Sequence, residues 1–313
     1  MTIIKPPRLR KGNIIGLVAP ASTPSSEETI EKGAAYLEQL GYRVIFGRYI
    51  RNTHGYCAGT DEERAADFNT MVRDKHVKAI FAIRGGYGTP RILKLIDYRS
   101  LKQHPKLIVG YSDITALQLA IFRKIGLVTL SGPMTGVEMW KGMDRYTEEN
   151  FWRLLTSTKK IGSLQNPVEE PLKILHHGKT RGRLLGGNFS LLACLIGTPF
   201  LPELRKSILI LEDVEEAPHR IDRMLAQLFN AGILHQLAGL VFGKFTDCNP
   251  SDPKELHLTI DQVLEEYSAK TNCPVITNFQ YGHVRRKLTI PIGLQVTLNT
   301  KQNHITVMES AVV

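Results

Sequence analysis

Residues 107–122, LIVGYSDITALQLAIF, pass from an apolar run into a helical pattern through the turn at residues 110–113. A serine at such a strand-to-helix turn is well placed to be a nucleophile, because the turn exposes its hydroxyl and the helix N-terminus directs backbone N–H groups at a developing oxyanion. Ser112 and Asp113 are also ordinary helix N-cap residues. Ile114 occupies the place of the second glycine in the Gly-x-Ser-x-Gly elbow, so the α/β-hydrolase fold is not supported. The turn alone leaves a helix cap and a nucleophile as open alternatives.

Strand and helix patterns alternate around this turn through the first half of the chain. They comprise apolar runs at residues 14–19, 42–46, 79–83 and 107–109, and helical patterns at residues 26–41, 60–73 and 90–96. Such alternation predicts a mostly parallel sheet with helices on both faces. Ligands of these sheets bind beyond the carboxyl ends of the strands, where residues 20–24, 84–88 and 110–113 form loops.

The second half of the chain begins near Gly182 and ends in a β-rich segment. Its patterns predict helices at residues 189–196, 219–228 and 259–269, and strands at residues 208–211, 240–242, 288–291, 294–298 and 304–308. We therefore predict an α/β protein with two domains and a cleft between them. The N-terminal parallel-sheet domain spans residues 1–150, an interdomain linker with some helix spans 151–181, and a smaller, β-rich α/β domain spans 182–313.

The composition favours a globular protein of the cytoplasm. The 313 residues are 42% hydrophobic and 22% charged, and the four cysteines form no Cys-x-x-Cys pair, so neither a zinc site nor a disulfide framework is indicated. Neither a membrane span of about 20 apolar residues nor a signal-peptide pattern is present. The net charge of +10 is spread along the chain, which suits an anionic small substrate better than a nucleic acid.

A glycine-rich loop, RGGYG, starts at Arg84 directly after a predicted strand. Glycines let the backbone approach a ligand closely and offer unshielded N–H groups, which suits an oxyanion hole or a carboxylate cradle. The loop has neither the Walker nor the dinucleotide-binding spacing. A tight turn that needs glycine for its backbone angles is an equally good interpretation.

Two further segments offer an acid and a base. Glu212 follows the apolar run at residues 208–211, where a carboxylate could orient a histidine or bind a cationic group; a solvated acidic loop is the alternative. His283 follows Gly282 in a loop, and an ordinary histidine pKa of about 6.5 suits a general base, although a surface histidine fits the same position. The other histidines lack metal-ligand spacing, so we expect no metal site.

Six short motifs occur in order along nearly the whole chain. They are IGLVAP at residues 15–20, RGGYG at 84–88, GYSD at 110–113, GGN at 186–188, LED with RIDRML within 211–225, and GH at 282–283. Together they resemble the LD-carboxypeptidases, a serine peptidase family that includes muramoyltetrapeptide carboxypeptidases and microcin C self-immunity proteins. The resemblance implies an N-terminal domain of flavodoxin-like or class I glutamine amidotransferase-like fold.

The resemblance also implies a Ser-His-Glu triad built from both domains. Ser112 would attack the substrate, His283 would act as base and then acid, and Glu212 would hold the imidazole. The backbone N–H groups of Gly86 and Asp113 would form the oxyanion hole.

The same resemblance suggests what the enzyme binds. Arg84, Tyr87 and Asn188 are candidates for substrate contact. The implied reaction is release of the terminal D-alanine from murein tetrapeptides in cytoplasmic cell-wall recycling, by a homodimer without metal or organic cofactor and without a nucleic-acid or membrane partner.

Two alternatives stay open. One is a microcin C-type immunity peptidase that hydrolyses the amide of a peptidyl nucleotide, with Trp140 or Trp152 stacking on the base. The other is a non-catalytic protein that binds a ligand in the cleft, with Ser112 as a helix cap.

Overall fold

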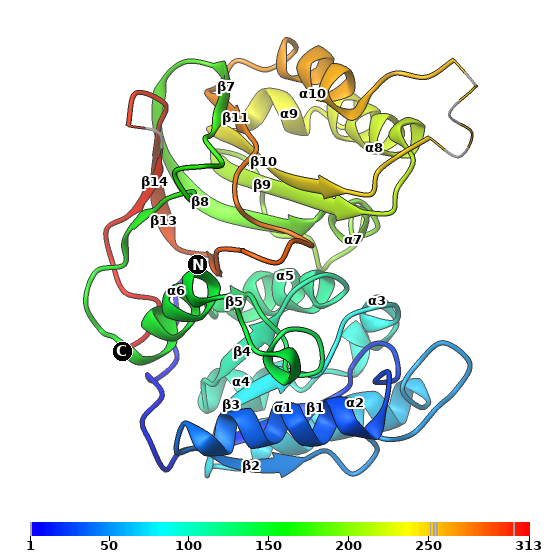
Figure 1. Ribbon diagram of the computed structural model, residues 1–313, viewed down its shortest axis with the longest axis vertical. Helices are drawn as coiled ribbons and strands as arrows, with labels where there is room; N and C mark the ends of the chain where they lie inside the picture. The colour runs from blue at the N-terminus through cyan, green and yellow to red at the C-terminus, as the bar shows by residue number, and fades with distance from the viewer. Residues whose placement is uncertain (1, 251, 253, 255, 303) are drawn as a thin grey trace.

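The computed structural model describes residues 2–250, 252, 254, 256–302 and 304–313. It contains two β-sheets, one above the other in Figure 1, with helices packed against both. The α/β fold predicted from the sequence, with a parallel sheet in the first half, is confirmed.

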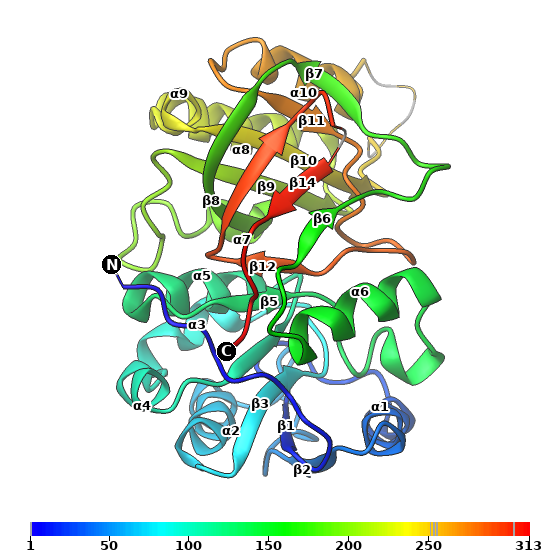
Figure 2. The same cartoon turned by 90° about the vertical axis from the view of Figure 1, so that its left-hand side faces the viewer.

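The first sheet follows the predicted alternation of strands and helices. Its parallel strands are β1 (Ile14–Val18), β2 (Arg43–Phe46), β3 (Val77–Ala82), β4 (Leu107–Gly110) and β5 (Thr129–Ser131). The helical segments between them are α1 (Glu27–Gln39), α2 (Asp61–Arg73), α3 (Thr89–Ile92), the 3-10 turn η1 (Leu93–Leu95), α4 (Tyr98–Gln103) and α5 (Ile114–Ile125). The side chains of Ser26 and Thr60 begin α1 and α2 by accepting a backbone N–H of the first turn. Figure 2 shows α1 on one side of the sheet and α2 and α4 on the other.

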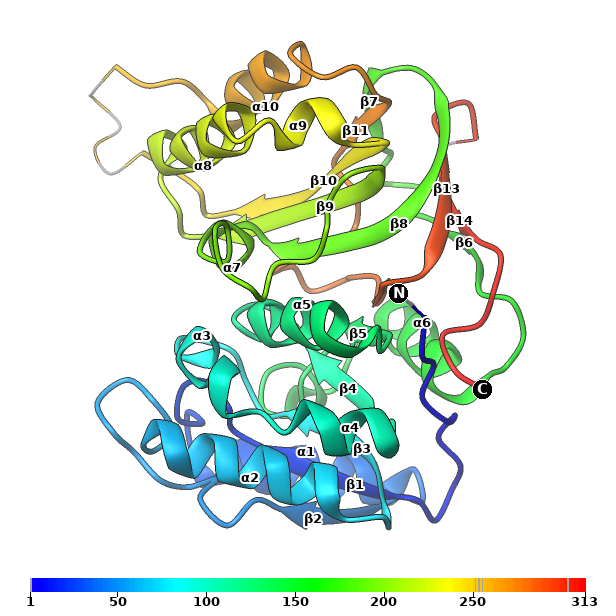
Figure 3. The same cartoon turned by 180° about the vertical axis from the view of Figure 1, so that it is seen from behind.

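The second sheet has a parallel centre and antiparallel edges. Its central strands are β8 (Lys179–Asn188), β9 (Ser207–Val214), β10 (Gly239–Thr246) and β11 (Val275–Thr277). The antiparallel strands are β6 (Gly162–Leu164), β7 (Lys173–His176), β13 (Gln295–Asn299) and β14 (His304–Val307). The helices are α7 (Phe189–Ala193), α8 (Pro218–Asn230), α9 (Ile233–Gln236) and α10 (Ile260–Ser268). In Figure 3, α8, α9 and α10 lie on the side of this sheet away from the first sheet.

One strand from the end of the chain belongs to the first sheet. We predicted residues 288–291 as a strand of the second half, but β12 (Ile290–Ile292) pairs antiparallel with β5. The side chains of Ile290 and Ile292 are fully buried there, and Pro291 is tolerated because β12 is an edge strand. The chain then turns at Gly293 into β13 of the second sheet. A pattern predicts a strand but not the sheet it joins.

The segment predicted as a linker, residues 151–181, is part of the folded body. It carries the end of α6 (Arg145–Thr156), which follows the 3-10 turn η2 (Met139–Lys141), and it supplies β6 and β7 to the second sheet. These two strands are short and mostly half-exposed, so they show no clear apolar pattern. The residue boundaries of the two domains stay a prediction.

Helix α5 lies between the two sheets, as Figure 3 shows. All of its residues except Arg123 and Lys124 are buried, and it contacts both β4 and β8. A helix that is apolar on every side is typical of a core. Within the described residues, no helix is long and apolar enough to cross a membrane.

Candidate active site

Ser112 lies in a strained turn between β4 and α5. Its φ angle of 62° is in the left-handed region, which residues with a Cβ rarely adopt, and its side chain is half-buried. In the described part of the chain, the hydroxyl of Ser112 makes no hydrogen bond, and no side chain caps α5. The helix-cap interpretation of Ser112 is therefore not supported, and its hydroxyl is free to react.

Glu212 and His283 form a hydrogen-bonded pair. Glu212 lies near the end of β9 and is fully buried; its Oε2 is 2.7 Å from Nδ1 of His283, whose side chain is 19% exposed. A Cβ on Gly282 would lie 2.8 Å from Oε2, so only glycine lets the loop approach the acid this closely. The other carboxylate oxygen, Oε1, has no partner among the described residues. The buried carboxylate thus holds the imidazole by one ring nitrogen and leaves Nε2 for another group.

The imidazole of His283 packs beside the serine turn. Its ring centroid is 5.0 Å from that of Tyr111, the residue before Ser112. The fold thus places His283, from the loop after β11, next to the serine turn that follows β4. Among the described residues, Ser112 and His283 are not hydrogen-bonded to each other, and such contacts are often looser before substrate binds.

The glycine loop at residues 84–88 lies against the serine. A Cβ on Gly85 would be 2.8 Å from Cβ and 3.0 Å from Oγ of Ser112. The backbone N–H groups of Gly86 and Asp113 donate no hydrogen bond within the described parts of the chain, and Gly86 is exposed. Both N–H groups are therefore free to bind an oxyanion beside the hydroxyl.

The side chain of Asp113 ties the serine turn to the glycine loop. Its carboxylate accepts the backbone N–H of Gly88 (3.2 Å) and of Thr89 (2.8 Å), and the buried Arg64 donates to the carbonyls of Gly88 (2.9 Å) and Pro20 (2.6 Å). Burial raises the pKa of the Asp113 carboxyl to about 6. The sequence indicated a helix cap or a backbone N–H donor for Asp113, not this link, and it gave no signal for Arg64, because an arginine in a helix is usually exposed.

Comparison with known proteins identifies the chain. Residues 15–132 match the LD-carboxypeptidase N-terminal domain, and residues 181–298 match the LD-carboxypeptidase C-terminal domain. The chain is 40% identical to the probable murein peptide carboxypeptidase of Bacillus subtilis over 95% of its own length and 92% of that protein. It belongs to the LD-carboxypeptidase family. As a member of this family it is a hydrolase, a carboxypeptidase of the serine type.

A further relative and a solved structure agree with this assignment. The murein tetrapeptide carboxypeptidase of Pseudomonas aeruginosa is 31% identical over 91% of this chain and 92% of that protein. The crystal structure of an MccF-like protein from Bacillus anthracis is 31% identical and superposes with a TM-score of 0.85, covering 98% of this chain and 99% of that chain. The similarity therefore extends over both sheets.

Two of the predicted substrate contacts of this LD-carboxypeptidase border the glycine loop. Arg84 is half-buried and donates to the carbonyl of Thr23 (3.3 Å). Tyr87 is 50% exposed, and its ring meets that of Tyr56 edge-on with centroids 5.0 Å apart. Both side chains are within reach of solvent, and their contact with substrate stays a prediction.

The third candidate, Asn188, is engaged within the protein. It is 3% exposed, its Oδ1 accepts the N–H of Leu191 at the start of α7, and its Nδ2 donates to Asp213 (2.8 Å). Asp213 also accepts both the N–H and the hydroxyl of Ser190, and burial raises its pKa to about 6. These contacts fix α7 to the end of β9 next to Glu212.

Lys287, Glu138 and Tyr111 form a buried network of charges and hydrogen bonds beside the serine turn. No pattern in the sequence indicated this network. Nζ of Lys287 is 2.5 Å from the Glu138 carboxylate and 2.9 Å from the hydroxyl of Tyr111, which itself donates to Glu138. Burial raises the pKa of Tyr111 well above its ordinary value, so the hydroxyl stays protonated. This network joins the loop that carries His283 to the turn that carries Ser112.

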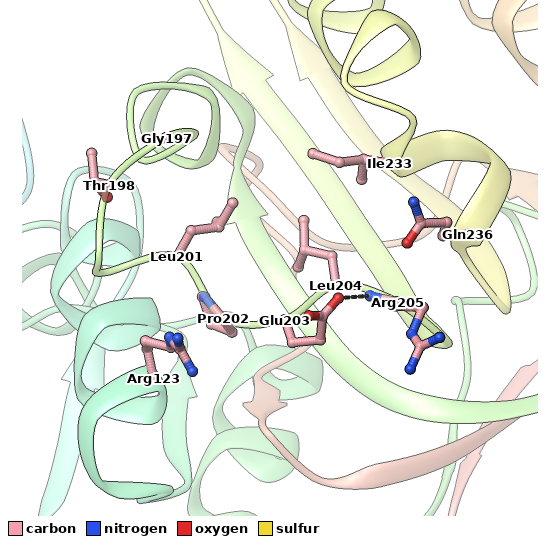
Figure 4. A pocket seen from close by; sticks show the side chains of 10 residues that line it. All are labelled: Arg123, Gly197, Thr198, Leu201, Pro202, Glu203, Leu204, Arg205, Ile233 and Gln236. Carbon is pink, nitrogen blue, oxygen red and sulfur yellow. Dashed lines mark hydrogen bonds between the residues drawn. The ribbon is translucent and has the colours of Figure 1, made fainter.

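Two hollows differ in their relation to this site. A cavity of about 470 Å³ is lined by His283 and Tyr111. Another hollow, of about 230 Å³, lies at the end of α5 beside Arg123 and Arg205 and contains none of the predicted site residues (Figure 4). Only the first hollow adjoins the candidate triad. No group of His, Cys, Asp and Glu side chains that could hold a metal ion occurs in the described chain.

Proposed function

We propose that this enzyme releases the terminal D-alanine from murein tetrapeptides with a triad of Ser112, His283 and Glu212. The observation that carries the proposal is the 2.7 Å hydrogen bond between Nδ1 of His283 and the buried carboxylate of Glu212, which accepts it; the ring of His283 packs against the residue before Ser112. A carboxylate bound to Nδ1 selects the tautomer that presents a basic Nε2 to the serine and stabilises the imidazolium formed later.

The proposed reaction runs through an acyl-enzyme. Ser112 Oγ attacks the carbonyl before the terminal D-alanine while His283 takes its proton, and the N–H groups of Gly86 and Asp113 bind the oxyanion. His283 then protonates the leaving amine, and D-alanine departs. Water, activated by the same imidazole, hydrolyses the ester and regenerates the serine.

The substrate assignment rests on the relatives and on charge. Two relatives are named as carboxypeptidases of murein peptides, and a net charge of +10 attracts a peptide that carries several carboxylates. A cytoplasmic location and a homodimer, which the resemblance implies, belong to this proposal. Light scattering after gel filtration measures the oligomeric state.

The test is D-alanine release from a defined murein tetrapeptide. We expect turnover by the wild-type enzyme, a loss on the order of 10⁴-fold in Ser112→Ala, and no release from a tetrapeptide that ends in L-alanine. Turnover by Ser112→Ala at the wild-type rate, or none by the folded wild-type enzyme, would reject the proposal.

The immunity-peptidase alternative has the MccF-like structure in its favour. The two tryptophans that this alternative would use to stack on a nucleobase are, however, engaged within the protein. Trp152 stacks on Tyr42 at 5.2 Å and donates to the hydroxyl of Tyr36, and Lys141 lies over the ring of Trp140. We therefore expect cleavage of an aminoacyl sulfamoyl adenosine to be slower than cleavage of the tetrapeptide, in an assay that compares the two at equal concentration.

A further inference from the structure

We propose that the cavity beside His283 is the site for the departing amino acid, and that Lys141 and Arg285 bind its terminal carboxylate. This inference rests on the proposed function and adds to it the residues that make the enzyme a carboxypeptidase. The cavity has a volume of about 470 Å³ and is lined by His283, Tyr111 and both cationic residues.

The position of the carboxylate follows from the second proton transfer. Because His283 must protonate the leaving amine, that nitrogen lies within hydrogen-bond reach of the imidazole, about 3 Å. The carboxylate carbon of the same amino acid is only two bonds further, about 2.5 Å from the nitrogen. The carboxylate must therefore lie within about 6 Å of the imidazole, and the cavity is a hollow beside that ring with room for it.

One charge pair in the wall of the cavity, Lys287 with Glu138, is already matched. Lys287 is 3% exposed and is bound to Glu138 at 2.5 Å and to the hydroxyl of Tyr111. Asp144 accepts the backbone N–H of Tyr146 at the start of α6. The ammonium of Lys287 is thus neutralised within the wall. The carboxylate of Asp144 has no salt-bridge partner among the described residues and would repel a substrate anion, so the cations that bind the anion must lie elsewhere on the cavity.

The cations at the rim, in contrast, are unmatched. Lys141 and Arg285 are both exposed, and neither has a carboxylate partner in the described portion of the chain; the ammonium of Lys141 lies over the ring of Trp140. Arg286, the next residue after Arg285, is paired with Glu169. An entering carboxylate would supply the partner that Lys141 and Arg285 lack, with charge-assisted hydrogen bonds.

Two other cationic side chains, Arg84 and Lys244, do not line this cavity. Arg84 lies on the glycine loop and donates to the carbonyl of Thr23. Lys244 is bound to Glu170 at 2.7 Å and to Asn278 at 2.6 Å. Lys141 and Arg285 are thus the pair that is both unpaired and in the cavity of His283.

The experiment compares Lys141→Gln, Arg285→Gln and the double variant with the wild type on a murein tetrapeptide. We expect KM to rise about 10-fold in each single variant and more in the double variant, with kcat changed less than about threefold, because the lost contacts are made in both ground and transition states. Lys159→Gln removes an exposed charge away from the cavity and should leave KM unchanged.

The tetrapeptide with a C-terminal amide is the internal control. Lacking the carboxylate, it should be a poor substrate for the wild type and equally poor for the double variant, which also shows that the triad of the variant is intact. A KM for the free acid that changes less than twofold in the double variant would overturn the inference. If Ser112→Ala turned over the tetrapeptide normally, the proposed function itself would fail, so the two failures are distinguishable.

Discussion

Ser112 adopts a left-handed backbone conformation, which is unusual for a residue other than glycine. A left-handed conformation costs about 1 kcal/mol for such a residue, and glycine avoids that cost. The loop at residues 84–88 and the network around Tyr111 hold the turn in place. The surroundings of Ser112 thus hold its backbone in the left-handed conformation, with the hydroxyl beside the glycine loop.

The strain predicts different stabilities for two variants that both lack the hydroxyl. Ser112→Gly should be more stable than Ser112→Ala by about 1 kcal/mol in urea unfolding, because glycine adopts the left-handed conformation without a Cβ clash. Neither variant should release D-alanine. Equal stability of the two proteins would show that the turn is unstrained.

The raised pKa of Asp113 should make the free energy of unfolding depend on pH. Burial raises its pKa to about 6, above the value of about 3.9 in an unfolded chain, so the folded state binds the proton more tightly. Its contribution to the free energy of unfolding is therefore present at low pH and falls as the pH rises from about 4 to about 6. We expect Asp113→Asn to destabilise the protein more at about pH 4.5 than at about pH 7.5, as measured by urea unfolding.

Asp97 is a control because its pKa is shifted in the opposite direction from that of Asp113. The backbone N–H of Ser100 lowers the pKa of the Asp97 carboxyl, so the stability it contributes is present at neutral pH and is lost as the pH falls. Asp97→Asn should cost no more stability at low pH than at neutral pH. A pH-independent effect of Asp113→Asn would contradict the buried, protonatable carboxyl.

At the scale of elements, the glycine loop and the serine turn fit together without room for a side chain. Gly85→Ala places a Cβ within 3.0 Å of both side-chain atoms of Ser112, so the serine or the loop must move. We expect kcat for D-alanine release to fall about 100-fold or more, because misplacement by about 1 Å is costly to catalysis. Gly197→Ala is the control: its φ of 83° makes alanine cost some stability, but nothing lies within 4 Å of the added Cβ, so its kcat should match the wild type.

Helices and strands with long apolar patterns were predictable from the sequence, whereas short strands with mixed polar and apolar residues were not. The apolar run and helix around Ser112 predicted β4 and α5 to within a few residues, because α5 is buried on nearly every side. β6 and β7 were missed because their side chains are mostly half-exposed. Asp113 shows the same limit: its hydrogen bonds to Gly88 and Thr89 depend on tertiary approach, which no local pattern encodes.

For the site, the residues alone left every role open. The Gly282–His283 loop and Glu212 were interpretable as surface features until the family resemblance joined them to Ser112. The structure supplies the physical link, a fully buried carboxylate 2.7 Å from the imidazole. Lys141 and Arg285 gave no signal because exposed cations are common on any protein surface.

At the scale of the whole molecule, the two sheets are interleaved. β12 comes from the end of the chain and completes the first sheet, and the C-terminal Val313 exchanges backbone hydrogen bonds with Pro6 and Arg8. Helix α5 contacts strands of both sheets. The first sheet is therefore complete only with a strand from the end of the chain, and the second sheet packs on a helix from the first half.

This interleaving predicts a single cooperative unfolding transition. In calorimetry, the measured enthalpy should equal the van't Hoff enthalpy. Ile290→Ala removes a fully buried side chain of β12 and should lower the one transition, at a cost of about 2–4 kcal/mol. Two separate transitions, with only one of them moved by Ile290→Ala, would mean that the halves unfold independently.

The most direct test of a triad assembled across two sheets is the kcat for D-alanine release of four proteins: wild type, Ser112→Ala, His283→Ala and the double variant. Residues that act as one unit lose their effect together, so each single variant should fall on the order of 10⁴-fold, and the double variant should be no slower than Ser112→Ala. If the two losses multiplied in the double variant, or if Ser112→Ala kept wild-type turnover, Ser112 and His283 would not be parts of one catalytic unit.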